Sequence, residues 1–222
     1  MLAAGALGLV AAERALILRA MSVFTTYLQL GFFHICSWQA TDHLTFLLAL
    51  CAPYVLADWR RVVALVTSFT VGHSLTLALA TLGVVQVNVP LVEALIPVTI
   101  LLTALVNIYR AGPALGRAPM RAAGSVVWAA PNLLAVAFGL IHGLGFSSYL
   151  RELLGHESRP VLELLSFNLG VELGQLLIVS LILLLGFLLL RGLGVARRDW
   201  VLTVSGAALG VSTLLLVQMA AG

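Results

Sequence analysis

The chain contains no lysine, and charged side chains of every kind make up only 9% of its 222 residues. A soluble globular domain carries about 25% charged residues. Hydrophobic residues reach 61%, and they form continuous runs rather than the alternating pattern of barrel strands. The composition excludes an ordinary soluble protein. It predicts an all-α fold, a polytopic transmembrane bundle of about six to seven helices in contact with a lipid bilayer.

Cysteine is also scarce. The two cysteines, Cys36 and Cys51, both lie in apolar segments, which excludes a disulfide framework and a thiolate metal cage. We expect small core residues, with Cys36 as a soft ligand beside His34 as the alternative. A phosphate-binding loop, a dinucleotide fingerprint and a nucleophile elbow are missing as well. The net charge of +3 comes from arginine alone, and we expect no nucleic-acid partner.

The apolar runs predict seven helical segments. They lie at about 22–38, 42–57, 62–83, 91–111, 125–150, 161–190 and 200–221. The first two are short, and they form either two spans or one broken helix pair. Residues 1–21 form an N-terminal segment, either an interfacial helix or an extension of the first span, because their apolar run is too short to cross ~30 Å of hydrocarbon. Residues 22–222 form a single transmembrane domain.

Arginine positions predict the topology. With seven spans, ten arginines fall on one side: Arg14, Arg19, Arg60, Arg61, Arg110, Arg117, Arg121, Arg191, Arg197 and Arg198. The other side has only Arg151 and Arg159, which Glu152, Glu157 and Glu163 offset. Because arginine accumulates in cytoplasmic loops, we expect a multi-pass protein of the bacterial inner membrane, with a cytoplasmic N-terminus and the C-terminus outside.

Six ionisable side chains interrupt the apolar segments or lie at their ends. They are His34, Asp42, His43, His73, His142 and Glu172. An ionisable group near the bilayer centre costs roughly 2.5–3.5 kcal/mol on insertion scales, so it is rarely present without a partner or a function. In the seven-span topology these groups share a depth in the outer half of the bundle. Imidazole and carboxylate are ligands for first-row transition metals, and the pattern predicts one metal site.

Further polar residues follow the same helix faces. Thr70 and Ser74 share a face with His73, and Asn168 and Gln175 share a face with Glu172. We expect these four residues to support the metal ligands from behind. Small-residue pairs at a spacing of four let helices approach closely. They predict helix packing at Gly139 and Gly143, Gly170 and Gly174, and Gly206 and Gly210.

Several blocks of the sequence resemble a known family. DHLTFLLAL, FTVGHSLTLALATLGVV, VEALIPVTI, FGLIHGLGFSSYLREL and FNLGVELGQL occur in this order within residues 28–190, and together they resemble the HupE/UreJ family of membrane proteins. Its members are described as hydrogenase or urease accessory proteins, and some as nickel or cobalt permeases. The resemblance implies that Asp42, His43, His73, His142 and Glu172 occupy the polar motif positions of the family.

The chain departs from that family at two points. The gap between the first histidine and the Asp42–His43 pair is longer than usual, with Ser37 to Thr41 between them. A Glu-Asn pair that the family often has late in the fourth helix is replaced by Val106 and Asn107.

These observations leave several functions open. The leading hypothesis is a divalent metal permease or accessory protein, with nickel favoured and zinc or cobalt as alternatives. It could work as a homo-oligomer or with metalloenzyme maturation proteins. The alternative is an intramembrane zinc-dependent hydrolase or transferase that uses the same cluster, with Glu172 or Asp42 as general base. Structural readings are an N-cap role for Asp42, histidines that only join helices, and haem ligation between His73 and His142.

Overall fold

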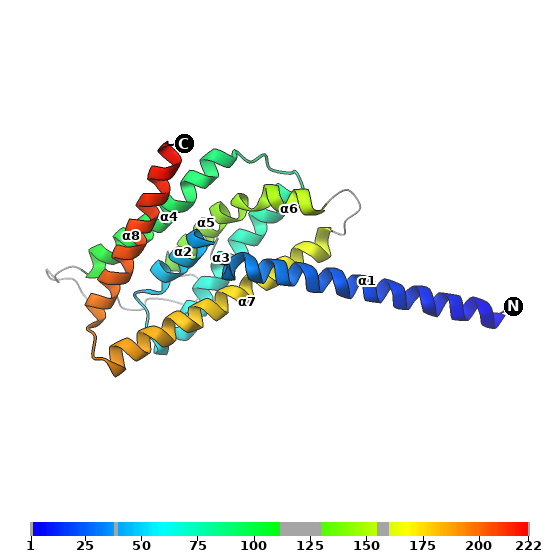
Figure 1. The fold of residues 1–222 in the computed structure, drawn as a ribbon, viewed down its shortest axis with the longest axis horizontal. Helices are drawn as coiled ribbons and strands as arrows, with labels where there is room; N and C mark the ends of the chain where they lie inside the picture. The colour runs from blue at the N-terminus through cyan, green and yellow to red at the C-terminus, as the bar shows by residue number, and fades with distance from the viewer. Residues whose placement is uncertain (1, 38–39, 112–129, 155–159, 222) are drawn as a thin grey trace.

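The structure is a computed structural model that describes residues 2–37, 40–111, 130–154 and 160–221, with side chains from Ile17 onward in the first helix. Every regular element in these residues is helical, so the all-α prediction is confirmed. The α-helices are α1 (Leu2–Cys36), α2 (Thr41–Cys51), α3 (Trp59–Thr81), α4 (Val89–Ala111), α5 (Ala130–Gly145), α6 (Ser147–Leu154), α7 (Pro160–Phe187) and α8 (Arg197–Ala221). A 3₁₀ turn, Leu56–Asp58, precedes α3, and a π-helical turn, Leu188–Gly192, extends α7 (Figure 1).

Four of the described helical stretches are long and apolar enough to cross a membrane: Leu56–Thr81, Val89–Ala111, Pro160–Gly192 and Arg197–Ala221. The pair α5 and α6, bent by 47° at their junction, adds a fifth if it is counted as one span. The chain is therefore a multi-pass membrane protein. The last five predicted segments, from 62–83 to 200–221, agree with these helices, except that residues 125–129 lie outside the described part. The topology prediction also uses Arg117, Arg121, Glu157 and Arg159, which lie outside the described residues as well.

Glycine brings two parallel helix pairs into backbone contact. A Cβ built on Gly139 or Gly143 of α5 would overlap the carbonyl oxygens of Phe69 and His73, respectively, in α3. In the same way, a Cβ on Gly170 of α7 would overlap a carbonyl of α1, and one on Gly174 would lie 3.1 Å from the Phe32 carbonyl oxygen. These two glycine pairs therefore join α3 to α5 and α7 to α1.

The third glycine pair behaves differently. A Cβ on Gly206 or Gly210 of α8 would meet no atom within 4 Å in the described part of the chain. The helix partner predicted for this pair is thus not one of the described helices. The pair serves below as a control for the other two.

The first two predicted segments form one broken helix pair. α2 has 11 residues, a length of about 16 Å, so it cannot span the ~30 Å hydrocarbon layer alone. α2 runs in the same direction as α4. Its beginning lies beside Glu93 and Ile96 in a shared cavity, and its Ala49 carbonyl accepts a hydrogen bond from Asn107 near the end of α4. α2 therefore continues in the direction of α1. Of the two alternatives predicted for residues 22–57, the structure agrees with one broken helix pair rather than two separate spans.

The direction of α1 also changes the predicted topology. Because α1 and α7 are parallel, the N-terminal end of α1 lies at the end of the bundle where α7 begins (Figure 1). α8 is antiparallel to α4, with Arg198 bonded to the Ala111 carbonyl at one end and Met219 beside Glu93 at the other. Both chain ends thus lie at the same end of the bundle. With both chain ends there, the prediction of termini on opposite sides of the membrane is not supported.

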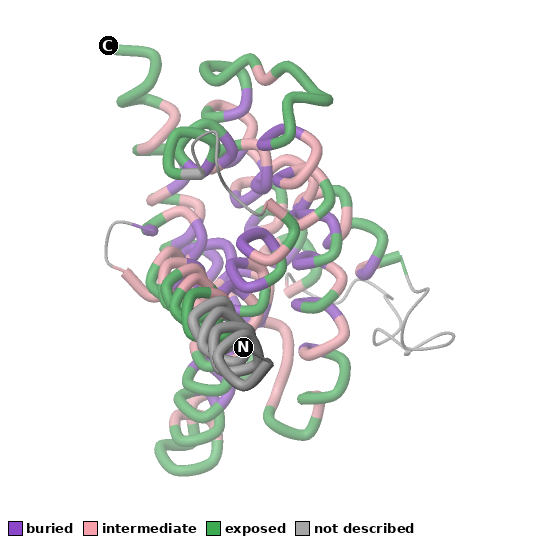
Figure 2. Tube along the Cα trace, turned by 90° about the vertical axis from the view of Figure 1, so that its right-hand side faces the viewer, coloured by how far each residue is buried: buried purple, intermediate pink, exposed green. Residues whose placement is uncertain are grey.

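Helix α2 occupies the centre of the molecule. Leu47 and Cys51 belong to one buried apolar cluster with residues of α1, α3 and α7. Phe46 and Ala49, on the other side of α2, belong to a second cluster with residues of α3, α4, α5 and α8. Figure 2 shows the buried residues concentrated in this interior, with exposed residues on the periphery. His43, in the first turn of α2, is therefore surrounded by other helices and is only 5% exposed.

Replacement of Gly139 tests the α3–α5 contact. Gly139→Val places a branched side chain against the Phe69 carbonyl, and overpacking of this kind typically costs 1–3 kcal/mol. We expect a lower midpoint of thermal unfolding for the purified protein in detergent. Gly206→Val is the matched control, because its site is open. Equal destabilisation by both variants would contradict the helix pairing described here.

Candidate metal centre

The break between α1 and α2 brings three of the predicted ligands together. His34 lies in the last turn of α1, and Asp42 and His43 lie in the first turn of α2. The rings of His34 and His43 have centroids 5.0 Å apart. Asp42 Oδ1 lies 3.1 Å from His43 Nδ1. The N-cap position of α2 belongs to Ala40, so the carboxylate of Asp42 serves the neighbouring imidazole rather than the helix end.

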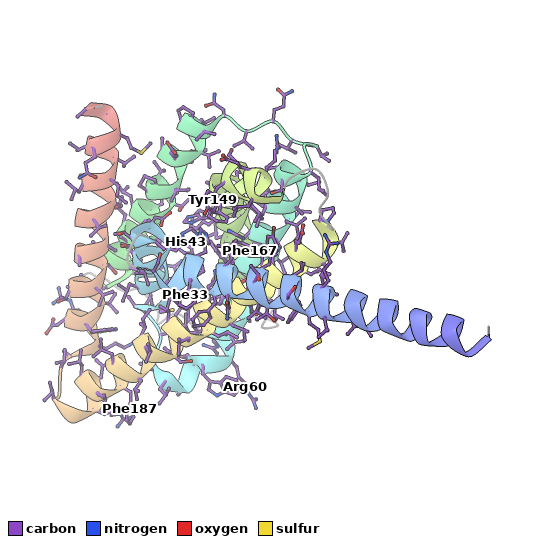
Figure 3. All side chains as sticks on the ribbon, turned by 45° about the vertical axis from the view of Figure 1, so that its right-hand side comes forward. Phe33, His43, Arg60, Tyr149, Phe167 and Phe187 are labelled. Atoms are coloured by element: carbon purple, nitrogen blue, oxygen red, sulfur yellow. The ribbon has the colours of Figure 1, made fainter. Side chains whose placement is uncertain are left out.

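The parallel packing of α3 and α5 delivers the other two histidines. The ring of His43 lies 6.2 Å from that of His73 and 5.1 Å from that of His142, measured between centroids. Phenylalanine rings surround the group, with Phe146 only 4.0 Å from His34. Figure 3 shows His43 in the interior of the bundle, with Arg60 near the opposite end of the molecule. Residues distant in the sequence thus meet at the helix break.

The ligand atoms form two overlapping sets. One atom each from His34, His43 and His73 lie within 4.8 Å of one another, and the same holds for Asp42, His43 and His142. His43 belongs to both sets. We name these five side chains, His34, Asp42, His43, His73 and His142, the histidine cluster.

The cluster is buried, and most of its ring nitrogens have no hydrogen-bond partner in the described residues. The exposed fractions of His43, His73 and His142 are 5%, 0% and 1%. The unpartnered buried nitrogens are Nε2 of His34, Nε2 of His43, both ring nitrogens of His73 and Nδ1 of His142. A buried polar atom without a partner costs about 1–3 kcal/mol. A bound cation would satisfy these nitrogens, so the residues present fit a transition metal ion.

Hydrogen bonds orient two of the rings. Asp42 holds Nδ1 of His43, which leaves Nε2 for an ion. The Thr99 hydroxyl donates to the Ile96 carbonyl, so its oxygen accepts from His142 Nε2 at 2.9 Å. This arrangement leaves the lone pair of His142 on Nδ1. Such partners fix the tautomer and the direction of metal-binding histidines.

A cavity of about 630 Å³ reaches the cluster. Its wall includes His34, Asp42, His43 and His142, together with Glu93 of α4 and Tyr149 of α6. An adjoining cavity of about 490 Å³ between α4 and α8 shares Asp42 and Glu93 with it. Both cavities lie at the end of the bundle where α4 begins, and they give the cluster access from that end.

Glu172 lies apart from the histidine cluster. It is in neither ligand set, and its Oε1 accepts a hydrogen bond of 2.6 Å from the Thr67 hydroxyl. Thr67 precedes His73 by six positions on α3, which corresponds to about 9 Å along the helix. The sequence predicts one site for all six ionisable groups. In the structure, the hydrogen-bond partner of Glu172 is Thr67.

Of the expected supporting residues, Asn168 lies against the His73 ring, while the others have contacts elsewhere. Thr70 donates to Gln175 Oε1 at 2.8 Å, which joins α3 to α7. Asn168 donates to the Leu164 carbonyl of its own helix, and Ser74 is half-buried. Cys36 packs with its sulfur 3.9 Å from the Gly174 carbonyl oxygen.

Sequence reasoning missed three polar residues. Thr99 supports His142, Glu93 lines both cavities and Thr67 binds Glu172. Thr67 could have been found as the neighbour of Thr70 at a spacing of three on the same helix. Glu93 could have been found as an acid within an apolar segment. Only the tertiary contact identifies Thr99.

Removal of the Thr99 hydroxyl tests this geometry. Thr99→Val leaves the Nε2 hydrogen of His142 without an acceptor, and loss of such a partner typically lowers metal affinity 10–100-fold. We expect this loss for Ni²⁺ by calorimetric titration of the purified protein. Thr103→Val is the control, since Thr103 bonds only the Thr99 carbonyl one turn further along α4. Equal affinity in the Thr99→Val variant and the parent chain would contradict the role assigned to Thr99.

Comparison with known proteins gives one result. The family model described as HupE / UreJ protein matches residues 11–219. Searches of curated proteins and of solved structures find no match.

Proposed function

The chain belongs to the HupE/UreJ family, and we propose that it is a membrane permease for a divalent transition metal, with nickel as the favoured cargo. The observation that supports this most directly is the histidine cluster. Side chains from four helices converge at a helix break inside a membrane bundle, and their buried nitrogens need a partner. The ion is the transported substrate, and the protein acts by binding it and letting it pass.

The donor set is suited to reversible binding. Three or four neutral imidazoles accept Ni²⁺, Co²⁺ or Zn²⁺, and the carboxylate of Asp42 offsets part of the charge. Both cysteines lie outside the two ligand sets, so the cluster offers no thiolate. A conducting site must attract the ion and still release it. Two sets that share His43 also offer the ion neighbouring positions within one cluster.

The helix break itself supports transport. α1 ends and α2 begins beside the cluster, so the carbonyl end of one helix and the amide end of the next both face the site. Interrupted helices near the bilayer midplane are typical of substrate sites in secondary transporters. Irregular backbone at membrane depth is tolerated where it is buried in protein or lines a cavity, and here other helices enclose it.

Arginine positions give the orientation we propose. Arg60, Arg61, Arg110, Arg191, Arg197 and Arg198 lie at the end of the bundle where α3 begins and α4 ends. By the positive-inside rule this end faces the cytoplasm of a bacterial inner membrane. His73 lies eight residues from the other end of α3, roughly 12 Å. The cavities and both chain ends then face outward, and the ion reaches the cluster from outside.

The zinc-dependent hydrolase or transferase remains the second reading of the same ligands. We favour transport because Asp42 is engaged with His43 and Glu172 is in neither ligand set, so neither acid is placed beside the cluster as a general base. Zinc that stays bound in a 1:1 ratio through purification, together with hydrolytic activity, would favour the enzyme. Assembly with a second copy or with metalloenzyme maturation proteins stays a prediction from the sequence.

Loss of His43 should abolish the function, because this residue belongs to both ligand sets. We expect His43→Ala to lower the initial rate of ⁶³Ni²⁺ uptake into proteoliposomes at least tenfold. His73→Ala, which removes a ligand from one set only, should lower it less. Each preparation is first checked for an unchanged helical spectrum.

The matched control is Tyr149→Phe, which changes the cavity wall without touching a ligand. Its uptake should stay within about twofold of the parent protein. Unchanged uptake in both histidine variants would remove the cluster from the transport path and end the proposal.

A further inference from the structure

A second polar site lies between α3 and α7, apart from the histidine cluster. Glu172 of α7 accepts the 2.6 Å hydrogen bond from Thr67 of α3. One turn along, Thr70 donates to Gln175 Oε1 at 2.8 Å. Thr67 and Thr70 are spaced by three residues, as are Glu172 and Gln175, so the two hydrogen bonds are successive links between the same helix faces.

These links lead away from the cluster toward the arginine-rich end. On α3, Thr70 lies three residues before His73 and Thr67 three residues before Thr70, in steps of about 4.5 Å along the helix axis. Thr70 is buried beside His73, and Thr67 lies at the exposed edge of this face. Thr67 lies on the side of His73 nearer Trp59, where α3 begins. The carboxylate of Glu172 is therefore held one to two helix turns beyond the cluster, on the side opposite the cavities.

Buried polar atoms at this interface lack partners in the described chain. They are Oε2 of Glu172, which is an acceptor, and Nε2 of Gln175, which is a donor. Gln175 is only 1% exposed. A buried polar atom in a native structure rarely lacks a partner unless an ion or water is bound there, and a cation would satisfy the acceptor Glu172 Oε2. The oxygens available, from a carboxylate, an amide and two hydroxyls, are ligands for a divalent cation.

We propose that Glu172, Thr67, Thr70 and Gln175 form an inner cation site, which receives the ion from the histidine cluster on its way to the cytoplasm. This inference rests on the proposed transport function and extends it to a second position. Oxygen donors hold Ni²⁺ and Co²⁺ less firmly than imidazoles do, so an ion moves from a site that captures it to a site that releases it. Glu172 supplies the negative charge that this transfer requires.

The experiment isolates the inner site by removing the outer one. Binding of ⁵⁷Co²⁺ to the purified full chain in detergent is measured by equilibrium dialysis for His43→Ala, for His43→Ala with Glu172→Gln, and for His43→Ala with Glu152→Gln. Gln at 172 keeps the shape of the side chain and its acceptor for Thr67, so the fold is preserved. Glu152 is an exposed acid of α6, and its replacement controls for the loss of one charge.

We expect the His43→Ala chain to bind one equivalent of Co²⁺ weakly. The double variant with Glu152→Gln should keep this weak binding. The double variant with Glu172→Gln should lose it, with an affinity for Co²⁺ at least tenfold lower. In the otherwise unchanged chain, Glu172→Gln should keep tight Co²⁺ binding within threefold and lower proteoliposome uptake at least tenfold.

Two results would overturn the inner site. One is a His43→Ala chain that binds no Co²⁺. The other is a weak equivalent that survives in the Glu172→Gln combination. A tenfold loss of tight binding on Glu172→Gln alone would likewise place Glu172 in the cluster and reject a separate site. If instead His43→Ala keeps the tight Co²⁺ equivalent, the outer cluster and the proposed function fail, whatever Glu172 does.

Discussion

The need to satisfy buried imidazoles inside a membrane bundle governs this structure. His43, His73 and His142 are almost fully enclosed by helices, and their free ring nitrogens face one another rather than backbone or solvent. Hydrocarbon offers no hydrogen bonds, so such groups persist only with a partner. Asp42 and Thr99 supply hydrogen-bond partners for His43 and His142, which offsets part of the cost of burying these rings. The remaining nitrogens are atoms that a bound metal ion could satisfy.

Close backbone contact makes the cluster possible. Gly139 and Gly143 let α5 lie directly against α3, and this contact sets His142 at the level of His73. Gly170 and Gly174 do the same for α7 against α1. The end of α1 thereby stops beside α3, where the chain breaks and begins again as α2. Small residues thus determine the position of the histidine cluster, because the distance between two helix axes decides which side chains can meet.

The acids are distributed along the bundle rather than collected at one point. Glu93 lines the cavities at one end, Asp42 stands in the histidine cluster, and Glu172 lies beyond it toward the arginine-rich end. A cation that crosses a low-dielectric region needs compensating charge at each position it occupies. A single group of all the acids would bind an ion without offering it a way onward. The spacing of the three carboxylates agrees with passage through the membrane.

The sequence by itself determined the all-α membrane class, most helix positions, the family, and five side chains that meet, because apolar runs, intramembrane ionisable residues and motif blocks are local signals. Only the tertiary structure decided that α1 and α2 form one broken helix pair, that both chain ends lie at one end of the bundle, and that Glu172 accepts a hydrogen bond from Thr67. Those facts depend on which helices pack in parallel and at what height. Packing of this kind arises from backbone contacts between residues far apart in the chain, and no spacing within one segment records it.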